Sequence, residues 1–443
     1  MRNSIWFSID DSFDEKLTLW LEKQSIGVCF KGDGWNIDGK LLAGFGQIQR
    51  IASDQPADII SFCEHSNDYV FCHLTYDVKN ALEKLESTGQ DHCIFPLFAS
   101  FIPEVVITVK GKDACYHYYP HIQSVAGLES IHQEIQAIDI NDIPAAFGDL
   151  PVKQRTSKEE YLEALGQIQA HIKQGNIYQA NFCHEFYWTS VSLSGAHAFN
   201  SGFRAFPNPF SAYYKTPYKQ LICFSPERFL SIDQNTITSQ PMKGTAPRGD
   251  NPADDEALKQ ALSNSEKERR ENVMIVDMVR NDLSHYAEKG SVKVPELYRI
   301  QTYPKVHQMY STVTAQLKAQ TPLMAALLKA FPMGSMTGAP KVRAMQILDE
   351  LEPTKRGIYS GTVGFITPNG SADFNVVIRS LVYNQSRHYL SCHAGGGITA
   401  LSNSLDEYEE SLLKARPLID LMNGLLSKKP ASVLPLPNEG LVD

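Results

Sequence analysis

The chain has 443 residues, of which 43% are hydrophobic and 21% are charged, and its formal net charge is −9. This composition is typical of a globular protein and excludes wholesale disorder. The negative charge provides no general attraction to nucleic-acid phosphates or to an anionic membrane surface, so we expect neither partner. Any anionic substrate must be held by local groups.

The N-terminal residues and the cysteines bear on the cellular compartment of the protein. The short apolar run Ile5–Phe7 is soon followed by Asp10 and Asp11, unlike a signal sequence, and no apolar stretch reaches membrane-spanning length. The eight cysteines are scattered without a C-x-x-C pair, which fits neither a disulfide framework nor a zinc site. These features predict a cytoplasmic protein with reduced thiols.

The first 150 residues alternate short apolar runs with turn residues, as in Val105–Val109 followed by Gly111. Such alternation predicts strands joined by tight turns. A chain of 443 residues forms either one large body or two domains, and the acidic stretch Asp139–Asp149 is the candidate boundary. The residues by themselves leave both arrangements open on either side of about residue 150, and we expect 426–443 to be a tail.

Helical and strand patterns follow in turn after residue 150. Apolar residues recur at helix spacing from Tyr161 to Ile172, with Ser157 at the start and Gly175 placed to end the helix. Further helices are expected over Pro252–Leu283 and Ala339–Leu351 and from Ser404, and strands over Thr236–Ser239, Gly361–Ile366, Phe374–Tyr383 and Tyr389–Cys392.

Four glutamates form two pairs at helical spacing, Glu268 with Glu271 and Glu407 with Glu410. Each pair shares a helix face. Hard cations such as Mg²⁺ prefer carboxylate oxygens, so the two pairs brought together would make a magnesium site that also holds an anionic substrate.

The same glutamates also fit structural roles. Glu407 lies three residues after Ser404, as in a capping box. Lys267 and Glu271 are four residues apart, and Lys414 lies four residues after the second glutamate of the other pair. Spacing by itself leaves both interpretations open.

Lys243 lies in the Gly- and Pro-containing segment Gln240–Arg248, which predicts a rigid loop after a strand. A lysine is a nucleophile only as the free amine, which burial or nearby cations favour. Glu227, one strand earlier, could exchange a proton there if a hairpin brings the two together. An exposed Glu–Lys ion pair is the structural alternative.

Two further features could face a ligand. Arg379 falls within the expected strand Phe374–Tyr383, where its guanidinium would hold a carboxylate if it faces a cleft and would be solvated otherwise. The run Gly395–Gly397 closes the last expected strand. It either lets the backbone approach a ligand closely or forms a tight turn.

Taken in order, the segments resemble the chorismate-utilising enzymes over about residues 157–418. The matching motifs are Ser225-Pro-Glu-Arg, Pro241-Met-Lys-Gly-Thr, Glu271-Asn-Val-Met, Gly334-Ser-Met-Thr-Gly-Ala-Pro-Lys, Ala394-Gly-Gly-Gly-Ile and Glu407-Tyr-Glu-Glu. The resemblance implies an α/β (α+β) fold in which large antiparallel sheets pack face to face with helices outside. It also implies that residues 151–425 bind chorismate and that residues 1–150 contribute strands to the same body.

Two positions indicate a branch of this family. Lys243 matches the lysine nucleophile of the aminodeoxychorismate branch, where the anthranilate branch typically has alanine. Gln179 stands where isochorismate and salicylate synthases carry a lysine that activates water, which argues against water as the nucleophile. The resemblance therefore implies amination of chorismate to 4-amino-4-deoxychorismate, for the synthesis of para-aminobenzoate and folate.

The same resemblance implies residue roles. Lys243 adds to C2 of the ring as the C4 hydroxyl leaves, ammonia then attacks C4 and expels the lysine, and Glu227 is the acid and base. Glu271 and Glu410 bind Mg²⁺ directly, and the other glutamate of each pair supports it through water. The positions expected around the substrate are Thr245, Thr337, Tyr359, Arg379, Gly395, Gly396, Gly397 and Lys414.

One position departs from the family pattern. The histidine that commonly precedes x-x-Ser is replaced by Gln308, which follows His307. In the anthranilate branch that histidine is linked with pyruvate elimination, so its replacement suits an enzyme that stops at aminodeoxychorismate.

The sequence also bears on the source of ammonia and on two alternative functions. No segment resembles a glutamine amidotransferase, so a separate glutaminase subunit or free ammonium is expected to supply ammonia. The alternative within the family is anthranilate synthase component I, which would release pyruvate. The alternative from another class is a non-catalytic chorismate-binding regulatory subunit, which would bind chorismate without turnover.

Overall fold

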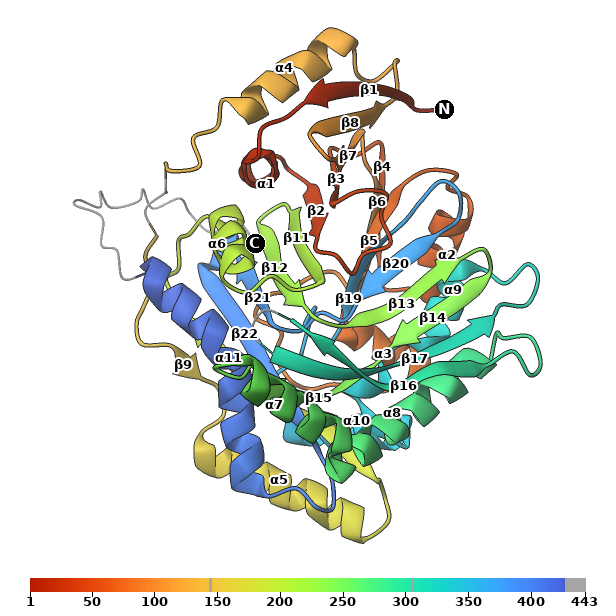
Figure 1. Cartoon of the computed structure of the whole chain (residues 1–443), viewed down its shortest axis with the longest axis vertical. Helices are drawn as coiled ribbons and strands as arrows, with labels where there is room; N and C mark the ends of the chain where they lie inside the picture. Colours follow the sequence, from red (N-terminus) through yellow and green to blue (C-terminus); the bar gives the residue numbers. More distant parts are fainter. Residues whose placement is uncertain (143–145, 304–305, 427–443) are drawn as a thin grey trace.

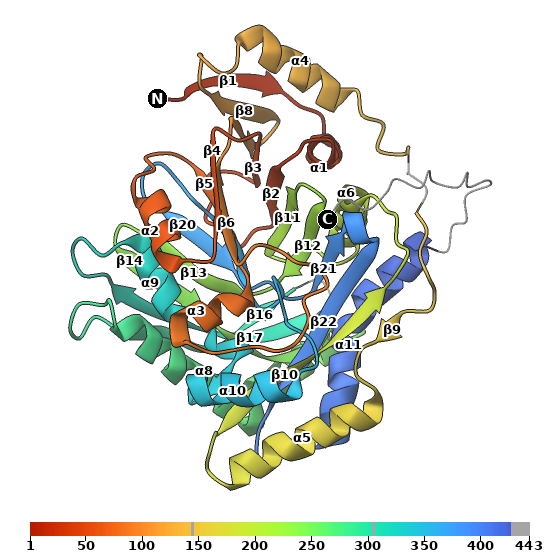
Figure 2. The ribbon, with the colours of Figure 1, turned by 180° about the vertical axis from the view of Figure 1, so that it is seen from behind.

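The computed structural model describes residues 1–142, 146–303 and 306–426. Two antiparallel sheets run through this part of the chain (Figures 1 and 2). The predicted tail at 426–443 lies outside the described residues except for Leu426, which ends the last helix.

Sheet A has twelve strands within the described residues. In spatial order they are β1 (Asn3–Ser8), β8 (Asp113–Tyr118), β7 (Val105–Lys110), β3 (Leu41–Phe45), β2 (Gly27–Lys31), β11 (Phe210–Thr216), β12 (Lys219–Ser225), β21 (Ser380–Asn384), β22 (Tyr389–Ile398), β10 (Gln179–Trp188) and β18 (Gly338–Ala339), with β9 (Lys153–Gln154) also paired to β10. The pairing of β2 with β11 joins the first 150 residues to the rest of the sheet.

Sheet B has ten strands in the same described ranges. Their order is β15 (Met242–Pro247), β17 (Val306–Gln316), β14 (Thr236–Gln240), β13 (Arg228–Asp233), β20 (Ala372–Asn375), β19 (Thr362–Ile366), β5 (Val70–Leu74), β6 (Phe98–Ile102) and β4 (Gln49–Ser53), with β16 (Lys293–Thr302) also paired to β17. Here β5 pairs with β19, so this sheet too combines early and late segments.

Helices cover the outer faces of both sheets. They are α1 (Phe13–Glu22), α2 (Pro56–Glu64), α3 (Lys79–Glu83), α4 (Val125–Gln136), α5 (Lys158–Lys173), α6 (Gly195–Ala205), α7 (Pro252–Asn264), α8 (Glu266–Ser284), α9 (Leu323–Ala330), α10 (Lys341–Leu351) and α11 (Ser404–Leu426), with short 3-10 turns at Tyr76–Val78, Gly334–Met336 and Gln385–Arg387. Helices α1, α4, α6 and α11 share a core with sheet A, and α2, α8 and α9 share one with sheet B.

A third core lies between the sheets. It packs Phe30 and Leu221 of sheet A against Phe71 and Phe365 of sheet B. The ring centroids of Phe30 and Phe365 are 5.2 Å apart. The prediction of large antiparallel sheets packed face to face with helices outside is therefore confirmed.

Local sequence signals explain the helix ends. Ser157 and Glu160 form a capping box at the start of α5, and Gly175 follows its end with φ of 76°. The single long helix predicted over Pro252–Leu283 is wrong. The chain is extended at Ser265, whose hydroxyl accepts from the backbone N–H of Glu268, so one helix ends there and α8 begins.

The eight cysteines are all buried and form no disulfide. In the part of the chain that the structure describes, no helix is both long enough and apolar enough to cross a membrane.

Candidate active site

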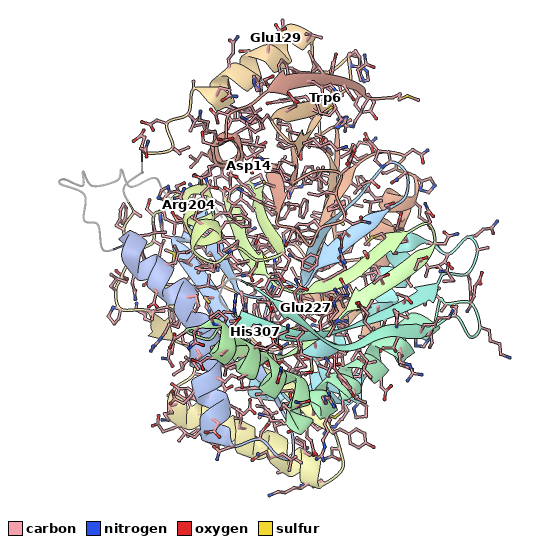
Figure 3. All side chains as sticks on the ribbon, viewed as in Figure 1. Trp6, Asp14, Glu129, Arg204, Glu227 and His307 are labelled. Carbon is pink, nitrogen blue, oxygen red and sulfur yellow. The ribbon has the colours of Figure 1, made fainter. Side chains whose placement is uncertain are left out.

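The chain crosses between the two sheets twice at one place, and each crossing carries a predicted site residue. Glu227 lies between β12 of sheet A and β13 of sheet B, and Arg379 lies where the chain returns from β20 to β21. The crossings are bonded to each other. The N–H of Phe224 donates to the carbonyl of Arg379 at 3.1 Å, and the N–H of Val376 donates to the carbonyl of Glu227 at 3.0 Å. Figure 3 shows Glu227 near the centre of the molecule.

The prediction that Arg379 lies within one strand is wrong. The expected strand Phe374–Tyr383 is divided into β20 and β21, which belong to different sheets, and Arg379 has a left-handed φ of 50°. A non-glycine residue takes this conformation only when its surroundings enforce it, as the crossing does here. Within the described residues the guanidinium is partly buried and has no hydrogen-bond or ion-pair partner, so it is available to an anion.

Glu227 is buried, with only 5% of its surface exposed, and Ser335 Oγ donates a hydrogen bond to its Oε1 at 2.7 Å. Burial raises the pKa of Glu227 to about 7, against the opposing effects of Ser335, the Met242 N–H and the charges of Lys243 and Arg379. Near neutral pH both protonation states are therefore populated, which suits an acid and base catalyst.

Lys243 lies on β15 at the edge of sheet B, so the predicted loop is wrong. The strand pairs with β17 and bulges between Met242 and Thr245, where Gly244 has φ of 90°. Lys243 Nζ is 3.4 Å from Glu271 Oε2. A Cβ built on Gly397 of β22 would lie 2.5 Å from Nζ, so glycine is required there to leave room for the amine.

The two glutamate pairs face each other from α8 and α11. Burial raises the pKa of Glu268, and the charges of Glu271 and Glu410 raise it further. Burial likewise raises the pKa of Glu407, as do the charges of Glu410 and Glu271. Each pair therefore lies near enough to raise the pKa of a glutamate in the other.

The structural alternative for Glu407 is wrong. Helix α11 is capped by Asn403, whose Oδ1 accepts from the N–H groups of Leu405 and Asp406, and not by Ser404. Oε1 of Glu407 accepts from Ser402 Oγ at 2.8 Å, so this carboxylate is held in place and forms no capping box.

Two lysines lie beside the carboxylates. Lys267 Nζ is 3.7 Å from Glu407 Oε1 on the other helix. Lys414 Nζ is 2.9 Å from Glu410 Oε1, as its spacing predicted, and donates to the Gly395 carbonyl at 3.0 Å. Burial would raise the pKa of Glu410, but Lys414, with further help from other lysines, holds it below its ordinary value.

The four glutamates have the donor type that suits a hard cation. Oε1 of Glu271 is buried and accepts no hydrogen bond from the described residues, and all four side chains offer the oxygen ligands that Mg²⁺ prefers. In the described ranges, no three His, Cys, Asp or Glu side chains lie close enough together to hold a metal ion as they stand. The ammonium groups of Lys243 and Lys267 lie against the carboxylates instead.

The predicted substrate residues differ in their availability. Thr245 is exposed on β15 and is paired with Gln308 of β17. Thr337 is fully buried, and its Oγ1 donates to the carbonyl of Met333 at 3.1 Å. Tyr359 is also buried, and its ring stacks on His393 with centroids 5.1 Å apart.

The three glycines lie inside β22, opposite Asn181–Cys183 of β10, and form no tight turn. A Cβ on Gly396 would be 3.2 Å from Glu407 Oε2, whereas Gly397 faces Lys243. The strand therefore passes between Glu407 on one face and Lys243 on the other.

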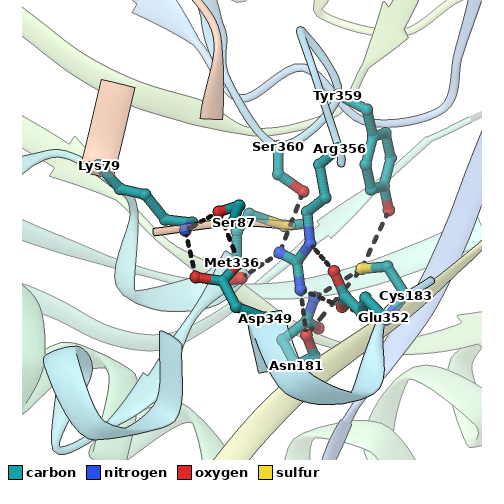
Figure 4. A network of polar contacts seen from close by, with 10 residues as sticks. All are labelled: Lys79, Ser87, Asn181, Cys183, Met336, Asp349, Glu352, Arg356, Tyr359 and Ser360. Carbon is teal, nitrogen blue, oxygen red and sulfur yellow. Dashed lines mark hydrogen bonds and ion pairs between the residues drawn. The ribbon is translucent and has the colours of Figure 1, made fainter. Parts of the chain in front are cut away.

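Figure 4 shows a supporting network that the sequence did not indicate. Buried Arg356 donates to Glu352 Oε1 at 2.6 Å, to the Asn181 carbonyl at 2.7 Å and to the Met336 carbonyl at 2.6 Å. It thereby ties β10 to the segment before Thr337. Ser335 was also missed, although it lies within one of the family motifs, because only the fold brings it to the acid.

The departure at Gln308 is visible in the structure. Gln308 is buried and its Oε1 accepts no hydrogen bond in the described part of the chain, and the same holds for Gln179. His307 is directed elsewhere, with Nε2 2.9 Å from Asp255 Oδ1 and Nδ1 2.9 Å from Thr302 Oγ1.

The chain is similar to several known proteins. The aminodeoxychorismate synthase component 1 proteins of Klebsiella aerogenes and Escherichia coli (strain K12) are 44% and 41% identical over 265 and 263 residues, in each case 59% of this chain. The matched parts span 58% and 57% of those relatives. The fold is similar to that of the menaquinone-specific isochorismate synthase MenF of Escherichia coli, with a TM-score of 0.75, 17% identity and coverage of 95% of this chain and 94% of that one.

The model of the chorismate binding enzyme family matches residues 31–420, which is most of the chain. The matched range includes both sheet crossings, Lys243 and both glutamate pairs. The chain therefore belongs to the chorismate binding enzyme family.

Proposed function

We propose that the chain aminates chorismate to 4-amino-4-deoxychorismate, with magnesium bound and ammonia as the nitrogen donor. The observation that carries the proposal is the position of Lys243 Nζ. This amine lies beside Gly397, and its charge acts on buried Glu227. The relatives named aminodeoxychorismate synthase component 1 support the same activity.

The charges suit a dianionic substrate. The guanidinium of Arg379, which has no partner among the described residues, would hold one carboxylate of chorismate by two parallel hydrogen bonds. Magnesium on Glu271 and Glu410, supported by Glu268 and Glu407, would supply positive charge for the ring carboxylate. Lys243 must leave its contact with Glu271 before its Nζ can act as a free amine.

The first chemical step forms a bond from Lys243 Nζ to C2 of the ring and breaks the bond from C4 to its hydroxyl. Protonated Glu227 gives its proton to the departing oxygen, which leaves as water, and the nitrogen of Lys243 becomes a secondary ammonium. A carboxyl whose pKa is about 7 can hold that proton near neutral pH.

In the second step ammonia attacks C4, and the bond between C2 and Lys243 breaks. Lys243 leaves as a neutral amine, and the new ammonium group at C4 returns a proton to Glu227. Both residues end in their starting states, and the net change is replacement of the hydroxyl by an amino group with release of water.

A second subunit is part of the proposal. The designation component 1 in the relatives' names supports a partner, and a glutamine amidotransferase would supply ammonia to this chain. The product would then serve para-aminobenzoate and folate synthesis. Eight buried free thiols suit a reducing compartment such as the cytoplasm.

The test is mass-resolved chromatography of the products formed from chorismate, Mg²⁺ and an ammonium salt. Aminodeoxychorismate without pyruvate is expected, and Lys243→Ala should lower its rate by at least 100-fold. Anthranilate with pyruvate would assign the chain to the other branch, and amination by Lys243→Ala at the wild-type rate would exclude covalent catalysis.

A further inference from the structure

A small cavity lies apart from Lys243 and the glutamate pairs, beside the segment 90–93 and the inner face of β22. Its lining includes Asp91, His92, Glu185, Lys355, Ser391 and His393. The cavity has about 260 Å³ of space not filled by atoms, part of it open to solvent, and the centre of a water-sized molecule can occupy about 10 Å³ of it. That is room for about one small molecule.

His393 gives this cavity an unused hydrogen-bond acceptor. Ser391 Oγ donates to Glu185 Oε1 at 2.8 Å, so the hydroxyl must accept from His393 Nδ1, which is 3.3 Å away. Nδ1 therefore carries the proton and Nε2 presents its lone pair. His393 is only 8% exposed, and Nε2 has no partner among the described residues. A buried acceptor in this state requires a donor.

The charges around the cavity suit a donor that is small and basic. Asp91 and Glu185 contribute negative charge, and Lys355 lies at the partly exposed rim. The nearby cations Arg155 and Arg356 are already engaged, the first by Glu185 and Tyr389 and the second by Glu352 and two carbonyls. Burial lowers the pKa of His393, with Glu185 and Asp91 opposing and Arg356 and Arg155 assisting, so its ring is neutral at neutral pH.

His393 connects the cavity to the strand that carries Gly397 of the candidate active site. His393 precedes Gly397 by four residues on the same face of β22, which is about 13 Å along a strand. Its ring stacks on Tyr359, whose hydroxyl reaches Cys183 Sγ at 3.8 Å, so His393 stands between the cavity and Tyr359.

We propose that this cavity binds ammonia or ammonium and delivers it toward Lys243, with His393 Nε2 accepting a hydrogen bond from the bound nitrogen. This inference rests on the proposed amination and names the place where its second substrate enters. Bound ammonia satisfies the buried acceptor, and the volume admits one such molecule.

The test compares two substitutions at His393. His393→Phe keeps an aromatic ring against Tyr359 and removes both nitrogens, whereas His393→Gln keeps an acceptor and removes the ring. The KM for ammonium chloride in chorismate amination should rise about tenfold in His393→Phe, the loss expected for one hydrogen bond, and His393→Gln should restore most of the difference. The KM for chorismate should stay within about twofold.

His132→Phe is the matched control, because His132 stacks on Phe7 in the same way, with centroids 4.5 Å apart. It lies on α4, which Figure 1 shows well away from β22, the strand that carries His393. This variant should leave the ammonium KM unchanged. A larger effect in His393→Gln than in His393→Phe, with a raised KM for chorismate, would show that the ring only packs Tyr359. Equal ammonium KM values in all variants would mean that the cavity holds water alone. Either result overturns the inference.

A binding measurement separates this inference from the proposed function. Thermal unfolding is followed in ammonium chloride and in sodium chloride of equal ionic strength. Ammonium should raise the Tm of the wild type and of His393→Gln but not of His393→Phe. Absence of this difference overturns the ammonia site, whereas its presence in a chain that forms no aminated product would overturn only the proposed reaction.

Discussion

Ser335 donates a hydrogen bond to the buried carboxyl of Glu227 across 2.7 Å, although the two residues are 108 positions apart in the chain. A hydrogen bond to a carboxylate stabilises its ionised form. Ser335 thus opposes the burial that raises the pKa of Glu227 to about 7, and it limits how far the acid form extends into the alkaline range.

Ser335→Ala should move the alkaline limb of the pH profile to higher pH. Without the hydrogen bond the pKa of Glu227 rises. The protonated form, which is needed for loss of the C4 hydroxyl, is therefore populated up to a higher pH. A hydrogen bond to a charged group of about 1.5 kcal/mol corresponds to a displacement of about one pH unit. The measurement is kcat/KM for chorismate from pH 6 to 10. Ser311→Ala, which removes a buried hydroxyl bonded to Asn272, is the control and should leave the limb in place. If the alkaline limb stays in place in Ser335→Ala, Glu227 is not the acid in this reaction.

Glu227→Gln should change how stability depends on pH. The pKa of Glu227 rises from 4.5 to about 7 on folding, so its contribution to the free energy of unfolding is complete below pH about 4.5 and is lost as pH rises through 7. Glutamine does not titrate. The free energy of unfolding of Glu227→Gln relative to the wild type should therefore increase by about 2–3 kcal/mol between pH 5 and pH 8. Urea unfolding at the two pH values measures it, and a constant difference would contradict the raised pKa.

Gly397→Ala should lower activity strongly while leaving the fold intact. The new methyl group would lie 2.5 Å from Lys243 Nζ, and the flexible lysine would move aside at little cost to stability. Displacing the amine by about 1 Å or more should lower kcat/KM by about 100-fold. Gly166→Ala in α5 is the control, because apart from the adjacent residues and backbone of its own helix no atom lies within 4 Å of a Cβ built there. It should keep full activity and gain about 0.5–1 kcal/mol of stability. Wild-type rates in Gly397→Ala would show that the position of Nζ does not matter.

Magnesium should stabilise the chain through Glu271. Its buried Oε1 has no hydrogen-bond partner in the described residues, so a cation would satisfy it. Magnesium chloride at about 100 times its dissociation constant should add about 2.7 kcal/mol to the free energy of unfolding, seen as a higher Tm. Glu271→Gln should lose this response. Glu266→Gln, at an exposed position of the same helix, should keep it. The same Tm response in Glu271→Gln would place the cation elsewhere.

The sequence by itself determined features that depend on neighbouring residues and on motif order. The capping box at Ser157 and Glu160 marks the start of α5 because both bonds form within one turn. The helical spacing of Glu268 with Glu271 and of Glu407 with Glu410 indicated two carboxylate faces, and the order of the motifs identified the family and its fold.

Only the tertiary structure decided which of these pieces meet. The pattern around Arg379 reads as one strand, because alternation reports which faces are buried and not which sheet a strand joins. Hydrogen bonds with distant partners divide that strand between two sheets and leave Arg379 beside Glu227. The contact of Ser335 with Glu227 and the cavity at His393 arise in the same way. Both depend on packing between residues that are far apart in the chain. The sequence around each residue does not indicate which distant residues it will contact.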